Sequence, residues 1–406
     1  MLLAAIPLCL LYSLMQIFTR TFLSTLALLL LSLPLFAQQT EKFHRKAIVA
    51  DTHNDFPSVA VERKYALEQD LKGKTHTDLN RMAAGGVDLQ VFSIFCGGNQ
   101  VDPFKFANQE IDSVEAWALR NPERMAYVKT FPELKRALRQ KKIAALIGVE
   151  GGHMIENDLA KLDALAYRGM CYLTLTWNNS IDWAASAADE TAGKREGGLS
   201  DFGKDVVRRL NAKGVMPDVS HLGEKTFWDL MAVTTKPVIA SHSSVYNITP
   251  VSRNLKDDQI RAIAKSGGVV FINFFPGFID SAFDRRFGEW ERSLEPMTDK
   301  LMNEKQLSRS EASRQVRRET RAELEKHLPG VDAVIDHIDY VVKLVGTDHV
   351  GLGADLDGIT FLPAGMQGVE DYLPITRGLL DRGYSKRDVK KILGRNFIRV
   401  YKETVR

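Results

Sequence analysis

Short apolar segments alternate with amphipathic segments from residue 40 to the end of the chain. Each apolar segment is nearly continuous in its hydrophobicity and rich in Val, Ile, Leu or Phe, which is typical of strands in a parallel sheet covered on both faces. The pattern predicts eight strands, at residues 46–50, 87–95, 143–149, 170–176, 215–219, 237–241, 268–274 and 349–354.

The amphipathic segments between these strands carry helix start and stop signals. The segment 159–167, for example, follows Asn157 and Asp158, either of which can cap a helix, and it is followed by Gly169 as a stop signal. No Gly-x-Gly-x-x-Gly pattern follows the first strand, so a dinucleotide-binding sheet is disfavoured. Eight strands alternating with helices predict a TIM-type (β/α)8 barrel.

One region departs from this alternation, namely residues 276–348 between the seventh and eighth strands. Within it, residues 289–327 are dense in Glu, Arg and Lys and have sparse apolar positions. We interpret this stretch as a charged, solvated helical insertion. A lid over the site and a dimer contact are the alternatives.

The composition sets limits on partners and compartment. Of 406 residues, 45% are hydrophobic and 26% are charged, and the formal net charge is only +3. Because no basic run is long enough to follow a nucleic-acid backbone, we do not expect a nucleic-acid partner. A homodimer is compatible with this composition.

The first 37 residues differ in kind from the rest of the chain. An apolar run at 22–36 follows Arg20 and ends at the small residue Ala37, which predicts a secretory signal peptide at 1–37 with Met15 as the better start. A membrane anchor built from both N-terminal apolar runs is the alternative. We therefore expect residues 38–406 to form a single periplasmic or secreted domain.

Candidate chemistry follows the expected strands at their carboxyl ends. His53 and Asp55 follow the first strand, and their spacing of two places both side chains on one face. Four further ionisable residues end later strands. They are Glu150, His221, His242 and Asp355. Because active sites of such barrels form at this end, and because mixed nitrogen and oxygen ligands suit zinc, we expect a metal site here.

These residues lie in motifs that together resemble the membrane (renal) dipeptidase family of zinc peptidases. The motifs are Asp-Thr-His-Asn-Asp at 51–55, Gly-Val-Glu-Gly-Gly-His at 148–153, Tyr-Leu-Thr-Leu-Thr at 172–176, Asp-Val-Ser-His at 218–221, Ala-Ser-His-Ser at 240–243, Arg-Asn at 253–254 and Gly-Ala-Asp-Leu-Asp-Gly at 353–358. The resemblance implies two zinc ions per chain, one held by His53 and Asp55, the other by His221 and His242, with Glu150 bridging them.

The resemblance also implies roles in substrate binding and proton transfer. Arg253 matches the family arginine that receives the terminal carboxylate of the substrate, and Asp355 matches the carboxylate that handles the proton and the substrate's amino group. There is one departure, since Trp177 stands where family members such as the mammalian enzyme carry a histidine. Trp177 or Asn178 could donate to an oxyanion, or Trp177 could simply narrow the pocket.

The expected function is zinc-dependent hydrolysis of dipeptides with a free C-terminal carboxylate. A hydroxide bridging the two metals would attack the carbonyl, with Asp355 as general base and then general acid. Two alternatives remain open from the sequence. One is another binuclear amidohydrolase acting on a cyclic amide or lactam, for which His-x-His after the first strand would be more usual. The other is a zinc-binding protein that has lost catalysis.

Overall fold

The computed structural model describes residues 38–405, which fall into two units that divide between Lys46 and Ala47. The first unit contributes a helical segment at 38–44, and the barrel lies wholly in the second unit. The expected signal peptide lies outside the described residues. No described helix is both long enough and apolar enough to cross a lipid bilayer.

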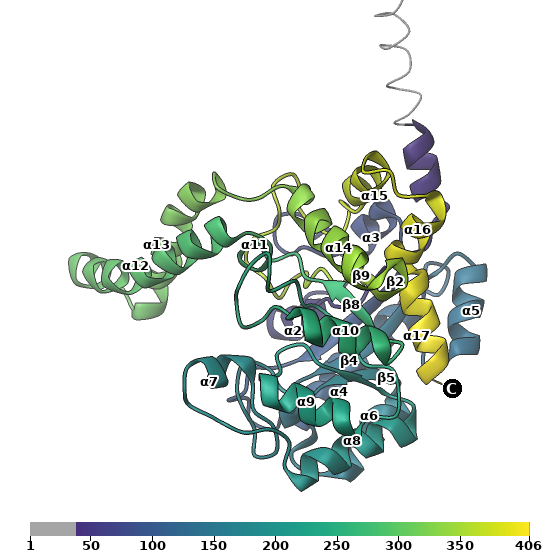
Figure 1. The fold of residues 1–406 in the computed structure, drawn as a ribbon. Helices are drawn as coiled ribbons and strands as arrows, with labels where there is room; N and C mark the ends of the chain where they lie inside the picture. Colours follow the sequence, from purple (N-terminus) through teal and green to yellow (C-terminus); the bar gives the residue numbers. More distant parts are fainter. Residues whose placement is uncertain (1–37, 406) are drawn as a thin grey trace, which may run out of the picture. The chain divides into compact units, whose positions relative to one another are not determined.

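The second unit is built on one parallel sheet that curves into a barrel (Figure 1). Along the sheet the order is β1-β2-β4-β5-β6-β7-β8-β9, and every neighbouring pair is parallel. The strands are β1 Val49–Asp51, β2 Val87–Phe95, β3 Met125–Tyr127, β4 Ile143–Glu150, β5 Met170–Thr174, β6 Met216–Asp218, β7 Ile239–Ala240, β8 Val269–Ile272 and β9 Val350–Leu352.

The last strand returns to the first, and backbone hydrogen bonds join them. Thr52 N donates to Leu352 O at 3.1 Å, and an isolated parallel bridge pairs Asn54 with Leu356. Farther along, the Asp355 N–H donates to the carbonyl of His53 at 3.1 Å. The (β/α)8 barrel predicted from the alternation is therefore confirmed, and His53 and Asp355 become neighbours across the closure.

Helices cover the outside of the barrel and end where the sequence signals predict. Asp158 caps its helix by accepting from the N–H of Ala160, and Gly169 ends it with φ of 107°. The helices are α2 Phe56–Arg63, α3 Leu79–Gly85, α4 Pro103–Arg120, α5 Phe131–Arg139, α6 Leu159–Arg168, α7 Ala187–Thr191, α8 Asp201–Lys213, α9 Glu224–Val233, α10 Asp257–Lys265, α11 Pro276–Ile279, α12 Ser281–Lys305, α13 Arg309–Glu325, α14 Val331–Val345, α15 Leu373–Asp381, α16 Lys386–Lys390 and α17 Asn396–Thr404, with short turns η1 Gly152–Ile155, η2 Thr347–His349 and η3 Lys391–Arg395.

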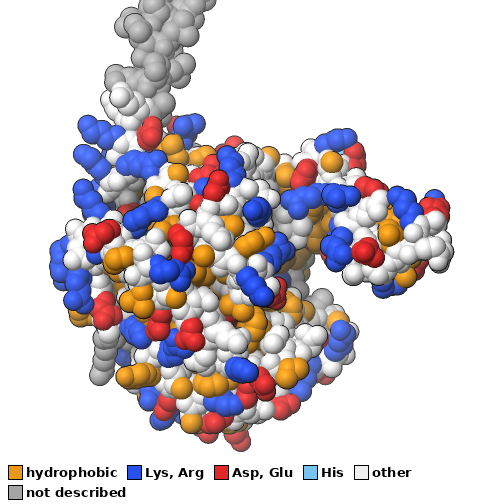
Figure 2. Space-filling model, turned by 180° about the vertical axis from the view of Figure 1, so that it is seen from behind, with side chains coloured by type: hydrophobic (Ala, Val, Ile, Leu, Met, Phe, Trp, Pro, Cys, Tyr) orange, Lys and Arg blue, Asp and Glu red, His pale blue; other side chains and the backbone are white. Residues whose placement is uncertain are grey.

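The expected insertion is a helical hairpin made of α12 and α13. Figure 2 shows Lys, Arg, Asp and Glu side chains of both signs on its surface, as the charged pattern predicted. A small aromatic cluster, centred on buried Phe283 and Phe361, packs at the base of the hairpin. The predicted stretch 289–327 lies mostly within this hairpin, although α12 begins earlier, at Ser281. The rest of the region 276–348 includes α14, which is a barrel helix that packs on α10, β8 and β9.

Strand β3 was not predicted from the sequence. It is only three residues long, is partly exposed, and pairs in parallel with the first half of β4. Such a short segment has no periodicity of its own that could be recognised. All eight predicted strands occur, as β1, β2 and β4 to β9, and their observed ends differ from the predicted ends by at most a few residues.

Candidate metal and catalytic site

The polar residues singled out in the sequence meet at one rim of the barrel. Parallel strands in a closed sheet present all their carboxyl ends at the same rim, so residues far apart in sequence converge there. His53 and Asp55 directly follow β1, and Glu150 is the last residue of β4. His221 and His242 follow β6 and β7 by three and two residues respectively.

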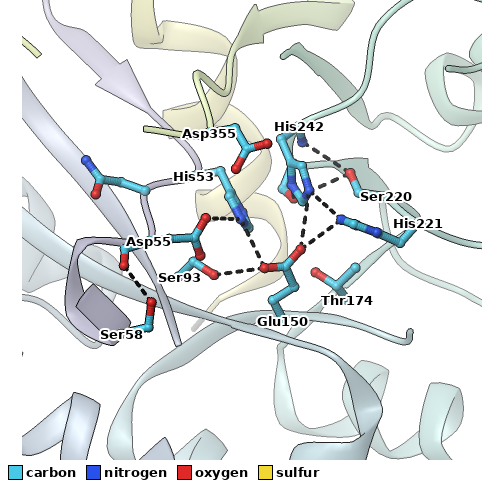
Figure 3. Close-up of polar contacts among 12 residues, drawn as sticks. His53, Asp55, Ser58, Ser93, Glu150, Thr174, Ser220, His221, His242 and Asp355 are labelled. Atoms are coloured by element: carbon cyan, nitrogen blue, oxygen red, sulfur yellow. Dashed lines mark hydrogen bonds and ion pairs between the residues drawn. The ribbon is translucent and has the colours of Figure 1, made fainter. Parts of the chain in front are cut away.

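Glu150 lies at the centre of this group (Figure 3). Its Oε2 lies 3.3 Å from His53 Nε2, and its Oε1 lies 2.9 Å from His221 Nε2 and 3.4 Å from His242 Nε2. Asp55 Oδ2 lies 3.6 Å from His53 Nε2. The two oxygens of Glu150 therefore face different partners. This arrangement suits a carboxylate that is shared by two cations.

The orientation of His53 is fixed by a hydrogen bond on the far side of its ring. Tyr172 donates its only hydroxyl proton to the carbonyl of Thr52 at 3.0 Å, so at 2.9 Å its oxygen must accept from His53 Nδ1. Nδ1 therefore carries a proton, and Nε2 is the ring nitrogen that faces Asp55 and Glu150 and can bind a metal ion once it is deprotonated. Such outer hydrogen bonds select the tautomer of metal-binding histidines.

His242 and His221 are oriented in the same way. Ser241 Oγ donates to Asp218 Oδ2 at 2.6 Å and therefore accepts from His242 Nδ1 at 2.8 Å. Asn178 Oδ1 lies 3.1 Å from His221 Nδ1. All three histidines thus direct Nε2 toward Glu150. This convergence explains the 3.0 Å approach of His221 Nε2 to His242 Nε2.

Replacing Ser241 should test whether these hydrogen bonds to the Nδ1 atoms support metal binding. In Ser241→Ala, the Nδ1 of His242 loses its acceptor and its link to Asp218, so we expect bound metal to dissociate about 10–100-fold more readily. Competition with a metal chelator would measure the change. Ser113→Ala is the matched control, because the Ser113 hydroxyl donates to Gln109 O within its own helix. Equal metal affinity in the two variants would contradict the orienting role.

The buried charges at the site call for a cation. Burial opposes protonation of His53, yet Glu150 and Asp55 raise its pKa to about 10. Burial raises the pKa of Asp55 well above its usual range, and the neighbouring carboxylates of Glu150 and Asp355 raise it further. Among the described residues, His53 Nε2 and Asp55 Oδ1 have no hydrogen-bond partner. Two buried ligand-type atoms without partners, beside several carboxylates, fit a divalent metal ion.

The other two histidines are neutral at physiological pH, as metal ligands must be. Burial lowers the pKa of His221 to about 4 and that of His242 well below its usual range. Burial alone would raise the pKa of Glu150, but the three histidines hold it well below its usual range. Glu150 is therefore ionised at the centre of the site.

Asp355 lies beside this group, after β9. Asp355, Asp55 and His53 each offer one possible ligand atom, and these three atoms lie within 4.8 Å of one another. Asn273 Nδ2 donates a hydrogen bond to Asp355 Oδ2 at 2.9 Å. Its φ is 62°, a left-handed conformation that is uncommon for a residue with a side chain. Gly358 permits this crowding, because a Cβ there would lie 2.0 Å from Asp55 Oδ2 and 2.5 Å from Asp355 Oδ1.

A cavity of about 400 Å³ opens over the site, and the remaining predicted residues line it. Arg253, Trp177 and Asn178 all contribute to its wall. Burial lowers the pKa of Arg253 to about 10, so its guanidinium remains charged, and its Nη1 is buried without a hydrogen-bond partner among the described residues. The Trp177 ring lies 5.0 Å from that of Phe95. The structure thus places a partly buried guanidinium, with an unpaired Nη1, in the wall of the cavity over the metal-ligand cluster.

Sequence reasoning did not find the residues that orient the histidines. Tyr172 and Asp218 occur in the quoted motifs, but nothing in their spacing assigns them a partner. Ser241 also lies in a quoted motif, and Asn273, which donates to Asp355, follows β8 directly; their places near strand ends are the one signal that could have found them. Asn178, which the sequence offers as a donor to an oxyanion, also has its side-chain oxygen 3.1 Å from His221 Nδ1.

The closed parallel barrel and the cluster of nitrogen and oxygen ligands at its carboxyl rim define the class as a (β/α)8-barrel metallohydrolase. A family model described as membrane dipeptidase (peptidase family M19) matches residues 37–406. The chain therefore belongs to this family, as the sequence motifs indicated, and is a hydrolase of the metallo-dipeptidase type.

Solved structures share this fold. The probable dipeptidase PvdM from Pseudomonas aeruginosa is 23% identical, with a TM-score of 0.74 over 91% of this chain and 98% of that one. A family M19 dipeptidase is 22% identical, with a TM-score of 0.71 over 88% and 99% of the two chains. A metallopeptidase from Rhodobacter sphaeroides, liganded with a phosphinate mimic of L-Ala-D-Ala, is 23% identical, with a TM-score of 0.70 over 88% and 99%.

Proposed function

We propose that the protein hydrolyses dipeptides with a free C-terminal carboxylate and uses two zinc ions per chain. His53 and Asp55 would hold one ion, His221 and His242 the other, and Glu150 would contact both. The observation that carries this proposal is that three Nε2 atoms face the two oxygens of Glu150, with Asp55 beside His53. Mixed imidazole and carboxylate ligands favour zinc among the common cations.

When bound, the zinc pair would lower the pKa of a water molecule and polarise the scissile carbonyl. The proton released from the water needs an acceptor, and Asp355 is a carboxylate at the site that is not in the proposed ligand set. Burial raises its pKa above its usual value, which suits a group that must take up a proton and then give it back. Asp355 would pass that proton to the leaving amine.

Arg253 would anchor the other end of the substrate. Its guanidinium lines the cavity and can form two parallel hydrogen bonds with a terminal carboxylate. Because Arg253 and Asp355 line the same cavity of about 400 Å³, a substrate that reaches both must be short. The phosphinate mimic of a dipeptide bound to the related Rhodobacter sphaeroides enzyme supports this substrate class.

Metal analysis combined with a substrate panel tests the proposal. We expect about two zinc ions per purified chain and hydrolysis of dipeptides, including L,D-dipeptides, in preference to cyclic amides and lactams. Turnover of the cyclic amides alone would instead support a different amidohydrolase. Bound zinc without hydrolysis of any amide would indicate a protein that has lost catalysis.

Substituting Arg253 should mainly affect binding. In Arg253→Ala, loss of two charged hydrogen bonds should raise KM for free dipeptides about 10–100-fold. For dipeptides amidated at the C-terminus, KM should be nearly the same in the variant and in the wild type, because these peptides lack the carboxylate that Arg253 would bind. Arg261→Ala is the matched control, since Arg261 is exposed on α10 and pairs with Asp257 at 3.8 Å. An equal effect on free and amidated peptides would refute the carboxylate-binding role.

A further inference from the structure

Three phenylalanines line the cavity near Arg253. Phe275 and Phe278 come from the segment after β8, and Phe287 comes from α12 of the insertion. Each is partly exposed, whereas Phe283 and Phe361, in the cluster at the base of the hairpin, are buried. Part of the apolar surface of these three rings therefore faces the active-site cavity.

The three rings form one continuous wall. Phe275 packs edge-to-face against both other rings, at 5.0 Å from Phe278 and 5.1 Å from Phe287, with interplanar angles of 81° in both pairs. The guanidinium carbon of Arg253 lies 5.5 Å from the centre of the Phe278 ring. The wall thus begins at the residue that would bind the substrate's carboxylate.

Packing behind Phe287 holds the wall in place. Its ring lies 5.7 Å from that of Trp290 and 6.2 Å from that of Phe361. The Trp290 indole also donates to Thr320 Oγ1 on α13 at 2.8 Å, which ties the two helices of the hairpin together. A preformed apolar surface of this kind binds an apolar group with little loss of conformational entropy.

We propose that Phe275, Phe278 and Phe287 form a subsite for a large apolar side chain on the C-terminal residue of the substrate. This inference rests on the proposed function, and in particular on Arg253 as the carboxylate anchor. The carboxylate and the side chain of a C-terminal residue are bonded to the same carbon atom. A carboxylate on Arg253 therefore brings that side chain close to the Phe278 end of the wall, not the side chain of the N-terminal residue.

The proposal also gives the charged insertion a function. One turn of α12 reaches the cavity, through Phe287 and Glu291, while the rest of the hairpin presents charged side chains to solvent. Through this turn, the insertion would favour substrates with an apolar C-terminal side chain.

Three dipeptides, Ala-Phe, Phe-Ala and Ala-Ala, test the subsite in the zinc-loaded protein. We expect wild-type kcat/KM to be at least about tenfold higher for Ala-Phe than for Ala-Ala, as is usual for an apolar pocket. Phe287→Ala should reduce this ratio about tenfold, and Phe287→Leu should restore most of it. The ratio of Phe-Ala to Ala-Ala should stay constant. Met297→Ala is the matched control, because Met297 is exposed on the same helix.

The possible results separate failure of the subsite from failure of the proposed function. Equal wild-type kcat/KM for Ala-Phe and Ala-Ala, or the same ratio in Phe287→Ala and Met297→Ala, would refute the subsite but leave the proposed function standing. If Phe287→Ala changed only the ratio of kcat/KM for Phe-Ala to that for Ala-Ala, the subsite would also be refuted, because the wall would then bind the side chain of the N-terminal residue. Failure of the zinc-loaded protein to cleave any of the three would refute the proposed function and the subsite with it.

Discussion

Asp355→Asn should lower kcat for dipeptide hydrolysis by about 10²–10⁴-fold while two zinc ions stay bound. Asparagine has nearly the same shape, and its carbonyl oxygen can still accept from Asn273, so the loop should keep its conformation. An amide cannot take up the proton from water, however, and cannot return it to the leaving amine. Steady-state kinetics with metal analysis of the same sample would measure both quantities.

Asp357→Asn is the matched control for this variant. Asp357 lies two residues away in the same loop and is also partly buried, but its Oδ1 accepts from the backbone N–H of His76 and its side chain does not line the active-site cavity. We expect its kcat to remain within a few-fold of wild type. An unchanged kcat in Asp355→Asn would remove Asp355 from the proton-transfer role.

Glu150→Gln should abolish the metal site itself. The substitution removes a negative charge that faces three histidines and replaces one of two acceptor oxygens with an amide N–H₂ group. Loss of an outer hydrogen bond already weakens zinc binding about 10–100-fold, so loss of a shared ligand should weaken it by more than about 100-fold. We expect less than two zinc ions per chain after dialysis, and a parallel loss of turnover.

Glu110→Gln provides the comparison. Glu110 is also fully buried, on α4, and burial raises the pKa of its carboxyl well above the usual range, which favours its uncharged form. Exchanging it for the neutral amide should leave two zinc ions bound. Glu150→Gln with two tightly held zinc ions and wild-type turnover would show that the metal lies elsewhere.

The contrast between these two glutamates shows how the barrel uses buried charge. Burial of Glu110 favours its uncharged form, whereas three histidines that face Glu150 favour its ionised form. The histidines are in turn fixed by Tyr172, Ser241 and Asn178. The orientation of the three imidazole rings therefore depends on hydrogen bonds from residues that surround the site.

The sequence by itself determined the barrel and the residues that meet at its rim. Apolar periodicity and helix caps are local properties, and they can be recognised without knowing any long-range contact. Once the strands were placed, the rule that parallel strands end at one rim brought His53, Glu150 and Asp355 together. The family motifs then implied their chemistry, and the family itself is confirmed.

Only the tertiary structure decided which side chains touch. The link from Tyr172 to His53 spans 119 residues and the two members of the barrel closure, Thr52 and Leu352, are 300 residues apart. The short strand β3 pairs with the start of β4, before the pairing of β4 with β5 begins at Ile147, and Phe287 packs against Phe361 while it lines the active-site cavity. Such contacts depend on how whole elements pack against one another, and no local pattern of residues records that packing.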